Sequence, residues 1–120
     1  MEPIHKSLEI KESPIHGLGV FAKEDIPINT RLAIFTGDRY SYKDFYAKYG
    51  NDRSYCYIAR RGNYILCAKE KRNVITYINE AKEPNVFLYR FKLRTIRDIK
   101  KGEELFLRYF EKYPRDYELK

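Results

Sequence analysis

The apolar residues of this chain fall into short runs that alternate with polar residues and are separated by turn residues. Leu8–Lys11 is one such run and Arg31–Phe35 is another, each with the period that predicts a half-buried strand. Ser54–Ile58 and Tyr64–Cys67 flank Arg61-Gly62-Asn63, which predicts a β-hairpin because glycine and asparagine tolerate a positive φ angle. Further strands are predicted at Gly19–Ala22, Phe91–Ile96 and Leu105–Tyr109. Many short strands predict a mainly β domain.

One segment has the residue spacing of a helix. The turn Thr36-Gly37-Asp38 closes the strand that precedes this segment. Ser41 is a suitable N-cap because Asp44 follows three residues later, and Gly50 ends the segment. Aromatic residues recur at helical spacing between these ends, at Tyr42, Phe45, Tyr46 and Tyr49. We interpret this stripe as a face that packs on the core and not as a cofactor site.

The length and composition predict a single domain over residues 1–120. The chain has 120 residues, of which 43% are hydrophobic and 16% aromatic, enough to build one core. No stretch approaches the roughly 18 apolar residues of a membrane span, and the segment Met1–Lys6 lacks the apolar run of a secretion signal. We therefore expect a soluble, intracellular protein with no membrane partner.

The cysteine pattern gives no indication of a metal site. Cys56 and Cys67 are the two cysteines, and together with two histidines they lack the repeated Cys-x-x-Cys spacing of a zinc site. Both lie in apolar runs, so we expect buried free thiols and no bound metal.

Three further segments have unusual composition, and each is weak evidence when taken alone. Gly17-Leu18-Gly19 has two glycines, as a tight turn needs, but no long helix pattern follows it as a dinucleotide fold requires. Asn79 and Asn85 bracket Pro84, and an asparagine amide either caps a loop or binds an adenine-like amine and ring nitrogen. Asp98–Tyr109 is a charged turn that leads into a strand ending in tyrosine.

Two of the turns share a short sequence pattern, which we call the echo. Asp25-Ile26 precedes Leu32 by the same step by which Asp98-Ile99 precedes Leu105. The echo predicts two similar turns that lead into strands, and it does not indicate a repeat architecture.

Taken together and in this order, the segments resemble the SET-domain family over about residues 8–113. The family's opening Gly-x-Gly-hydrophobic-Phe-Ala segment is matched by Gly17–Ala22, and the sequence then follows the family at Asp25-Ile26 and near Phe35-Thr36-Gly37. A Ser-Tyr-x-Phe-like strand resembles Ser54–Tyr57. The Asn-containing segment is similar to Thr76–Asn85, and the closing Asp-Ile-x-x-Gly-Glu-Glu-Leu-x-x-x-Tyr pattern is matched at every fixed position of Asp98–Tyr109.

The resemblance implies a mainly β SET fold of several small β-sheets, one or two short helices and a knot-like C-terminal segment. It also implies an S-adenosylmethionine-dependent protein lysine methyltransferase that acts on histone tails and thus on chromatin. Such a chain lacks the cysteine-rich flanking modules of many eukaryotic members, and it is most similar to the minimal SET proteins of viruses and bacteria. The nucleus, of the host for a viral or bacterial protein, is then the expected compartment.

The resemblance also implies a set of catalytic and substrate-binding residues. Tyr109 corresponds to the catalytic tyrosine, whose hydroxyl points at the reacting methyl group and amine, and Tyr55 lines the lysine channel from the opposite side. Tyr57 is a further channel candidate, and Leu107 takes the place at which some members have a Phe or Tyr that limits the number of methyl groups added. The smaller Leu107 predicts that more than one methyl group is added.

The expected cofactor site combines two of the motifs. The backbone around Gly17, Leu18 and Gly19 would hold the methionine end of the cofactor, while Asn79 and Glu80 would contact its adenine side. Outside this set, Asn85 is expected to brace its loop and His16 to be structural.

Several positions depart from the family pattern. Glu80 replaces a histidine, Thr76 an arginine, Arg108 an acid and Phe110 a glycine. Glu80, Arg108 and the formal charge of +7 leave open a catalytically silent SET module that binds chromatin or nucleic acid. A methyltransferase of a non-histone protein is a further alternative. The departures at Glu80 and Thr76 are tolerated where the backbone holds the cofactor and lower its affinity where a side chain does.

The formal charge of +7 bears on the partners. It favours polyanions such as nucleosomal DNA through long-range attraction, although any basic, soluble surface carries the same charge. Basic histone tails would be repelled unless the groove is acidic or DNA supplies the attraction, and Glu80, Glu83, Glu103 and Glu104 are the acids considered for that groove. The sequence leaves open the substrate lysine, the degree of methylation and whether the chain forms a homodimer.

Overall fold

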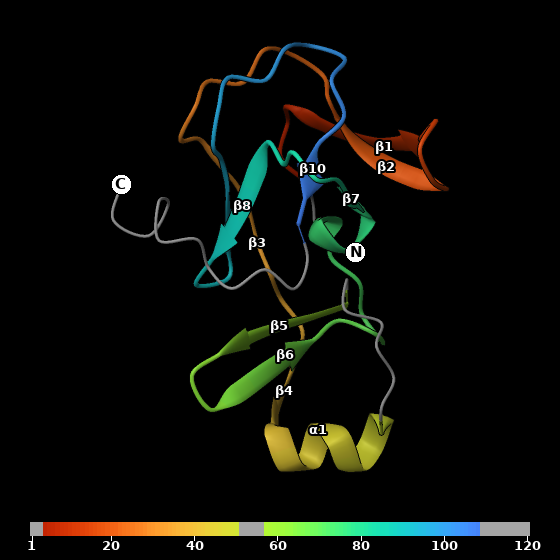
Figure 1. Cartoon of the computed structure of the whole chain (residues 1–120), viewed down its shortest axis with the longest axis vertical. Coiled ribbons are helices and arrows are strands. Elements are labelled where there is room, and N and C mark those ends of the chain that lie inside the picture. The colour runs from red at the N-terminus through yellow and green to blue at the C-terminus, as the bar shows by residue number, and fades with distance from the viewer. Residues whose placement is uncertain (1–3, 51–56, 109–120) are drawn as a thin grey trace.

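The structure, a computed structural model, describes residues 4–50 and 57–108 (Figure 1). Its elements in chain order are β1 (Leu8–Glu12), β2 (Leu18–Ala22), β3 (Arg31–Ile34), β4 (Asp38–Ser41), α1 (Tyr42–Tyr49), β5 (Ile58–Arg61), β6 (Tyr64–Cys67), the short 3-10 helix η2 (Val74–Tyr77), β7 (Asn79–Glu80), β8 (Val86–Tyr89), β9 (Lys92–Thr95) and β10 (Phe106–Leu107). The mainly β prediction is confirmed.

The strands form small sheets and not one continuous sheet. Two antiparallel three-stranded sheets have the orders β3-β9-β8 and β4-β6-β5, while β1 pairs with β2 and β7 pairs with β10. The β7–β10 pair is parallel, with Asn79 opposite Phe106 and Glu80 opposite Leu107. This set of small sheets with one short α-helix is the arrangement that the SET resemblance implies; the segment beyond Arg108 lies outside the described residues.

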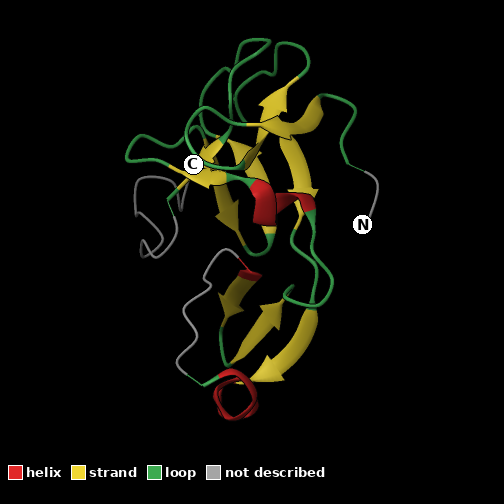
Figure 2. Ribbon diagram, turned by 90° about the vertical axis from the view of Figure 1, so that its right-hand side faces the viewer, coloured by secondary structure: helices red, strands yellow, loops and turns green. Residues whose placement is uncertain are grey.

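The sheets separate into two lobes. The small lobe comprises residues 38–50 and 57–67, with the β4-β6-β5 sheet and α1, and the large lobe comprises residues 4–36 and 74–108, with the other sheets. Figure 2 shows the small lobe below the large one, with the axis of α1 nearly along the line of sight. The chain passes from one lobe to the other through Gly37, where a Cβ atom would collide with the backbone carbonyl of Cys67.

The small lobe folds as its local sequence signals predict. The Ser41 hydroxyl accepts a hydrogen bond from the Asp44 amide at 3.1 Å, and Gly50 ends the helix with a φ of 60°. Phe45 is buried and contributes to a small core with Ile65 and Cys67. The expected stripe is only partly correct, since Tyr46 stays 42% exposed. The predicted hairpin is formed by β5 and β6; residues 54–56 of its first strand lie outside the described residues, as does Cys56.

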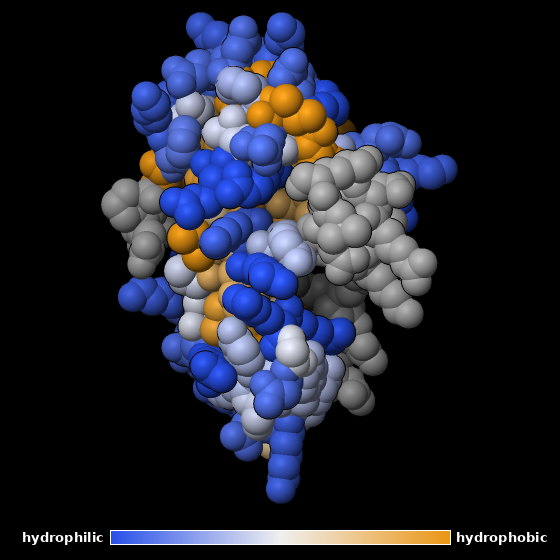
Figure 3. Space-filling view, turned by 90° about the vertical axis from the view of Figure 1, so that its left-hand side faces the viewer, coloured by the Kyte–Doolittle hydropathy of each residue, from blue (hydrophilic) through white to orange (hydrophobic). Residues whose placement is uncertain are grey.

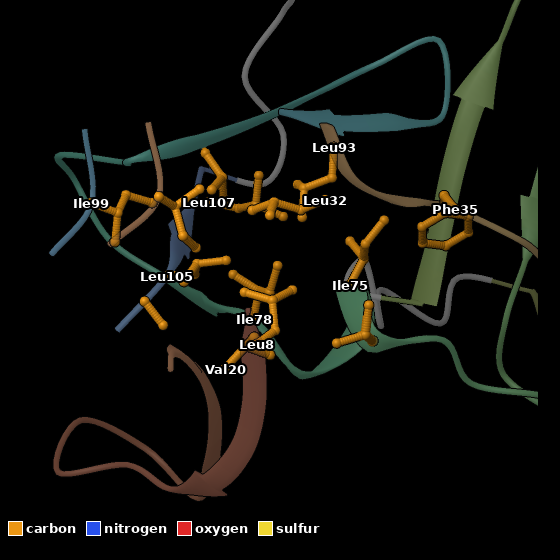
Figure 4. Close-up of a cluster of buried hydrophobic side chains, with 14 of the residues drawn as sticks. Leu8, Val20, Leu32, Phe35, Ile75, Ile78, Leu93, Ile99, Leu105 and Leu107 are labelled. Atoms are coloured by element: carbon orange, nitrogen blue, oxygen red, sulfur yellow. The ribbon is translucent and has the colours of Figure 1, made fainter. Parts of the chain in front are cut away.

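The large lobe contains the main core. Its buried apolar side chains come from every strand pair of the lobe and from η2, as Figure 4 shows. They include Leu8, Val20, Leu32, Phe35, Ile75, Ile78, Leu93, Ile99, Leu105 and Leu107. This core stabilises segments that are far apart in the sequence, because burial of apolar surface does not depend on sequence separation.

The two echoed turns of the sequence face each other in this lobe. Ile26 and Ile99 form an isolated antiparallel bridge. Each turn also caps the other, because the Asp98 carboxylate accepts from the Ile28 amide and the Asp25 carboxylate accepts from the Lys101 amide, both at 2.8 Å. The prediction of two similar turns is confirmed, and their mutual pairing explains the similarity.

Three strands, β4, β7 and β8, and the 3-10 helix η2 were not predicted. Residues Asp38–Ser41 form β4, where a turn was expected to include Asp38. Its polar, mostly exposed sequence shows no alternation, and it becomes a strand only because it pairs with β6 from residues 64–67. The strand β8 is a short apolar run whose type cannot be read from periodicity alone.

Candidate active site

The turn of residues 13–17 connects β1 to β2 in the large lobe; Gly17 ends this turn, and Leu18 and Gly19 begin β2. The Ser13 amide donates to the Gly17 carbonyl at 2.7 Å, which closes the turn. Gly17 has a φ of 47°, which favours glycine, and a Cβ atom at this position would meet no atom within 4 Å. Leu18 is 47% exposed. The turn is therefore open on its outer side, where a ligand would approach the backbone.

The side chain of Asn79 ties this turn to the Asn-containing segment. Its Nδ2 group donates to the carbonyls of His16 at 3.0 Å and Leu18 at 3.1 Å, and to the Glu104 carboxylate at 2.8 Å. All three partners are acceptors, which fixes the orientation of the amide. No donor from the described residues reaches Asn79 Oδ1. The amide thus joins the three sequence motifs at one point and retains an acceptor. His16 contributes its carbonyl to this contact, in line with the structural role expected for it.

Glu104 is the residue of this site that the sequence reasoning missed. By sequence, it is one of four acids considered for a substrate groove, but it is only 8% exposed and accepts hydrogen bonds from the Ser13 hydroxyl at 2.8 Å and from Asn79. Its carboxylate packs so closely on Gly19 that a Cβ atom there would collide with it. Among the described residues, no lysine or arginine nitrogen lies within ion-pair distance of Glu104. A buried carboxylate beside the glycine turn is thus held by neutral donors alone.

Asn85 braces its loop, as expected. Its side chain is 1% exposed, donates to the Glu104 carbonyl at 2.8 Å and accepts from the Phe106 amide at 2.7 Å. The Asn85 backbone amide also donates to the Phe106 carbonyl at 3.1 Å. These bonds hold the loop before β8 against the segment that carries Glu104 and β10.

Two other predicted residues, Glu80 and Leu107, are register partners in the β7–β10 pair but differ in burial. Glu80 is exposed, as the expected contact with a ligand requires, whereas Leu107 is 4% exposed and packs in the main core. Tyr55 and Tyr109, the predicted catalytic pair, lie outside the described residues. The assignments of Tyr55, Tyr109 and Leu107 therefore stay predictions.

Tyr57, the third channel candidate, is one of two tyrosines that pack on the Arg72 guanidinium. The Arg72 guanidinium lies over the Tyr77 ring at 3.7 Å and over the Tyr57 ring at 4.8 Å. It also donates to the hydroxyl and the carbonyl of Thr76, at 3.0 and 2.8 Å. Thr76 is the position at which the family has an arginine, and Arg72 brings a guanidinium to it from four residues earlier. The four-residue spacing of Arg72 and Thr76 is the sequence signal from which this contact could have been predicted.

A second charged cluster lies in the small lobe at the end of α1. Lys48 donates to the Tyr40 hydroxyl at 2.9 Å and to the Glu70 carboxylate at 3.0 Å, and these bonds raise the pKa of the Lys48 ammonium above its usual value. The hydrogen bond from Lys48 lowers the pKa of the Glu70 carboxyl. Partial burial raises the pKa of the Tyr49 hydroxyl to about 12. The two charged groups of this cluster are exposed and its two tyrosines are half-buried, and the cluster lacks the converging motifs of the large lobe.

The described residues contain neither a metal-binding cluster nor a membrane-spanning helix. Within 4–50 and 57–108, no group of three or more His, Cys, Asp or Glu side chains is placed to hold a metal ion. In the same ranges, no helix has the length and apolarity to cross a membrane.

Comparison with known proteins gives consistent matches. The family model described as SET domain matches residues 17–110. Histone-lysine N-methyltransferase SETD2 from Mus musculus and from Homo sapiens are each 25% identical over 126 residues, which cover 93% of this chain and 5% of the SETD2 sequence. The chain therefore spans about a twentieth of the length of these relatives.

Solved structures give the same result. The Chaetomium thermophilum polycomb repressive complex 2 matches with a TM-score of 0.75 and 27% identity, over 92% of this chain and 16% of that chain. A structure described as ctPRC2 in an autoinhibited conformation bound to S-adenosylmethionine matches with a TM-score of 0.77 and 27% identity, over the same 92% and 16%.

Proposed function

The chain belongs to the SET-domain family, and from this premise we propose that it is an S-adenosylmethionine-dependent protein lysine methyltransferase. One observation carries the proposal. The glycine turn, the Asn-containing segment and the closing Glu-Glu-Leu segment meet at the amide of Asn79, which belongs to the second of them and donates hydrogen bonds to the other two. These three segments are far apart in the sequence, and a ligand bound beside Asn79 would be within reach of all of them.

The residues at this point fit S-adenosylmethionine in charge and shape. The cofactor has a positive sulfonium and a positive amino group, and the site offers the Asn79 Oδ1 acceptor and the Glu104 carboxylate. A buried carboxylate is stabilised by a nearby cation, and the described residues supply none, so a cationic ligand would complete the pair. The open face of Gly17 leaves room for the ligand. Glu80 lies next to Asn79, exposed, for the adenine side.

The proposed chemistry is an in-line displacement. When bound, S-adenosylmethionine supplies a methyl group on a sulfonium; as the new bond from the lysine nitrogen to carbon forms, the bond from carbon to sulfur breaks. The lysine must first lose a proton, because only the neutral amine has a free electron pair. The Tyr109 hydroxyl aligns the amine, Tyr55 and Tyr57 flank the lysine stem, and their rings create poor solvation that lowers the lysine pKa. The absence of a phenol at Leu107 leaves room for more than one methyl group.

Histone tails are the proposed substrates, by likeness to the histone-lysine N-methyltransferase SETD2. A basic tail favours an acidic groove, and the structure narrows the candidates for it. Glu104 is buried and is the residue proposed to face the cofactor, so it is not assigned to this groove, while Glu80 and Glu83 are exposed. Glu103 accepts from the Lys100 amide and the Arg97 guanidinium. A nuclear location follows if chromatin is the target.

The experiment is transfer of labelled methyl groups from S-adenosylmethionine to core histones and to nucleosomes. Wild type should incorporate label, and Tyr109→Phe should not, because it lacks the aligning hydroxyl. Tyr46→Phe is the matched control, since this hydroxyl lies on α1 in the small lobe and should leave the rate unchanged. Equal rates for wild type and Tyr109→Phe would contradict the assignment of Tyr109. Label on other proteins of a cell extract, but not on histones, would move the substrate to a non-histone protein.

A catalytically silent SET module is the second candidate. The observation that favours it is the exposed Arg108 at the position of the family's acid, next to the predicted catalytic tyrosine. Calorimetry separates the two candidates. Heat of binding with S-adenosylmethionine supports the enzyme, and its absence in a folded sample supports the silent module.

A further inference from the structure

The outer face of the β3-β9-β8 sheet presents a row of cations. Strand β9 alternates between exposed Lys92 and Arg94 and buried Leu93 and Thr95. The register places Arg31 of β3 directly opposite Arg94. Side chains of directly opposite residues point to the same face, with Cβ atoms about 5 Å apart. The three cations therefore share one face, and the core lies behind it.

This row is not neutralised by the fold. From residue 86 to residue 97 the sequence has four basic residues and no acid. Among the described residues, no carboxylate lies within ion-pair distance of Arg31, Lys92 or Arg94. Like charges directly opposite each other on neighbouring strands destabilise a sheet, so the pair Arg31 and Arg94 carries a repulsion that a bound anion would relieve.

The row continues along the molecule into the small lobe. The Arg39 guanidinium of β4 lies over the Tyr64 ring at 3.9 Å, and that ring packs on Phe91 of the large lobe at 5.9 Å. Arg61 is directly opposite Tyr64 in the β5–β6 register and is exposed. Figure 3 shows one side of the molecule, on which strongly hydrophilic side chains lie over both lobes. We name the surface formed by Arg31, Lys92, Arg94, Arg39 and Arg61 the basic stripe.

We propose that the basic stripe binds the phosphate backbone of double-stranded DNA. Duplex DNA presents a negative charge about every 1.7 Å along its axis, so a long row of cations meets phosphates along its whole length. Four of the five cations are arginines, whose guanidinium groups bind phosphate oxygens in pairs. A single strand is a poorer fit, because such binding needs exposed rings for base stacking, and the rings on this surface, Phe87, Tyr89 and Tyr64, are each half-buried.

The test is the affinity for a short labelled duplex, measured by fluorescence anisotropy without cofactor at several salt concentrations. If about four phosphates are contacted, the affinity should fall on the order of 10²-fold between 50 and 200 mM salt. The double variant Lys92→Gln and Arg94→Gln should lower the slope of log K against log salt by about two. Lys6→Gln with Lys23→Gln is the matched control, because it removes the same charge from exposed residues outside this sheet and should leave the slope nearly unchanged.

Three results would overturn the proposal. They are no duplex binding by folded wild type, equal loss of slope in the two double variants, and displacement of the duplex by polyglutamate at equal charge concentration. The last would indicate an acidic protein as the partner. Unchanged unfolding temperatures confirm that the variants are folded. Calorimetry with S-adenosylmethionine on the same samples keeps this proposal separate from the proposed function, because loss of either kind of binding is recorded independently.

Discussion

The two lobes are stabilised in different ways. In the small lobe, Phe45 contacts the rings of Tyr40, Tyr46 and Tyr49, and no polar side chain is buried among the described residues of that lobe. In the large lobe, Asn79, Asn85 and Glu104 join segments up to 91 residues apart by hydrogen bonds. Packing alone tolerates small shifts, whereas a buried polar network fixes one geometry. The polar network lies in the large lobe, the lobe for which we propose cofactor binding.

The largest loss of stability is expected in the small lobe. Phe45→Ala removes a side chain that is 1% exposed and should lower the free energy of unfolding by about 3–5 kcal/mol. Phe45→Leu retains most of the apolar volume and should cost less. Urea denaturation gives both values. If the lobes differ as described, folded Phe45→Leu binds S-adenosylmethionine as wild type does, and weakened binding would break the comparison.

A loss of similar size is expected from Asn85→Ala, which breaks the network. The substitution leaves the Phe106 amide and the Glu104 carbonyl without their partner, at about 1–3 kcal/mol for each buried group. Cofactor affinity should fall with it, because the segment that carries Glu104 loosens. Asn63→Ala in the exposed hairpin turn of the small lobe is the control, with an expected change within about 0.5 kcal/mol. Similar denaturation midpoints for the two variants would refute the role of Asn85.

Alanine variants of two glycines, one beside Glu104 in the large lobe and one at the connection to the small lobe, test whether only the first position affects cofactor binding. A Cβ atom at Gly19 would press on the Glu104 carboxylate, and one at Gly37 would press on the Cys67 carbonyl. Each alanine variant should cost about 1–3 kcal/mol through the forced shift. Only Gly19→Ala should also weaken cofactor binding, by roughly tenfold, equivalent to about 1.4 kcal/mol. Calorimetry on both variants decides, and equal affinities would remove the argument that Glu104 positions the glycine turn.

The smallest effect is expected at the exposed charged cluster of the small lobe. The hydrogen bond from Lys48 lowers the pKa of Glu70 below its ordinary 4.5, so its contribution to stability is present above pH 4.5 and is lost as the pH falls through the lowered pKa. Glu70→Gln should flatten this acid limb. Lys48 has the opposite sign, since its contribution is present below pH 10.5 and is lost above it. Urea midpoints at a series of pH values measure the slope, with exposed Glu83→Gln as the control.

The two lobes also differ in how well the sequence predicted them. The helix and the hairpin of the small lobe depend on neighbours in the sequence, such as Ser41 with Asp44 and the turn at Gly62, and both were predicted. Strand β4 was not, because it depends on pairing with β6. In the large lobe, the SET resemblance pointed to Gly17, Gly19 and Asn79 before any contact was known. It did not reveal Glu104, because neither burial nor a partner 91 residues away leaves a local pattern.

The central claim is that the large lobe holds a cationic cofactor beside Glu104. Titration calorimetry of wild type, Glu104→Gln and Glu103→Gln with S-adenosylmethionine tests it directly. Glu103→Gln removes the same charge one residue away, from a side chain that bonds the Lys100 amide and Arg97. The account predicts binding by wild type, nearly equal binding by Glu103→Gln, and affinity reduced about tenfold or more, at least about 1.4 kcal/mol, for Glu104→Gln. Equal affinities for the two variants, or no binding by folded wild type, would contradict it.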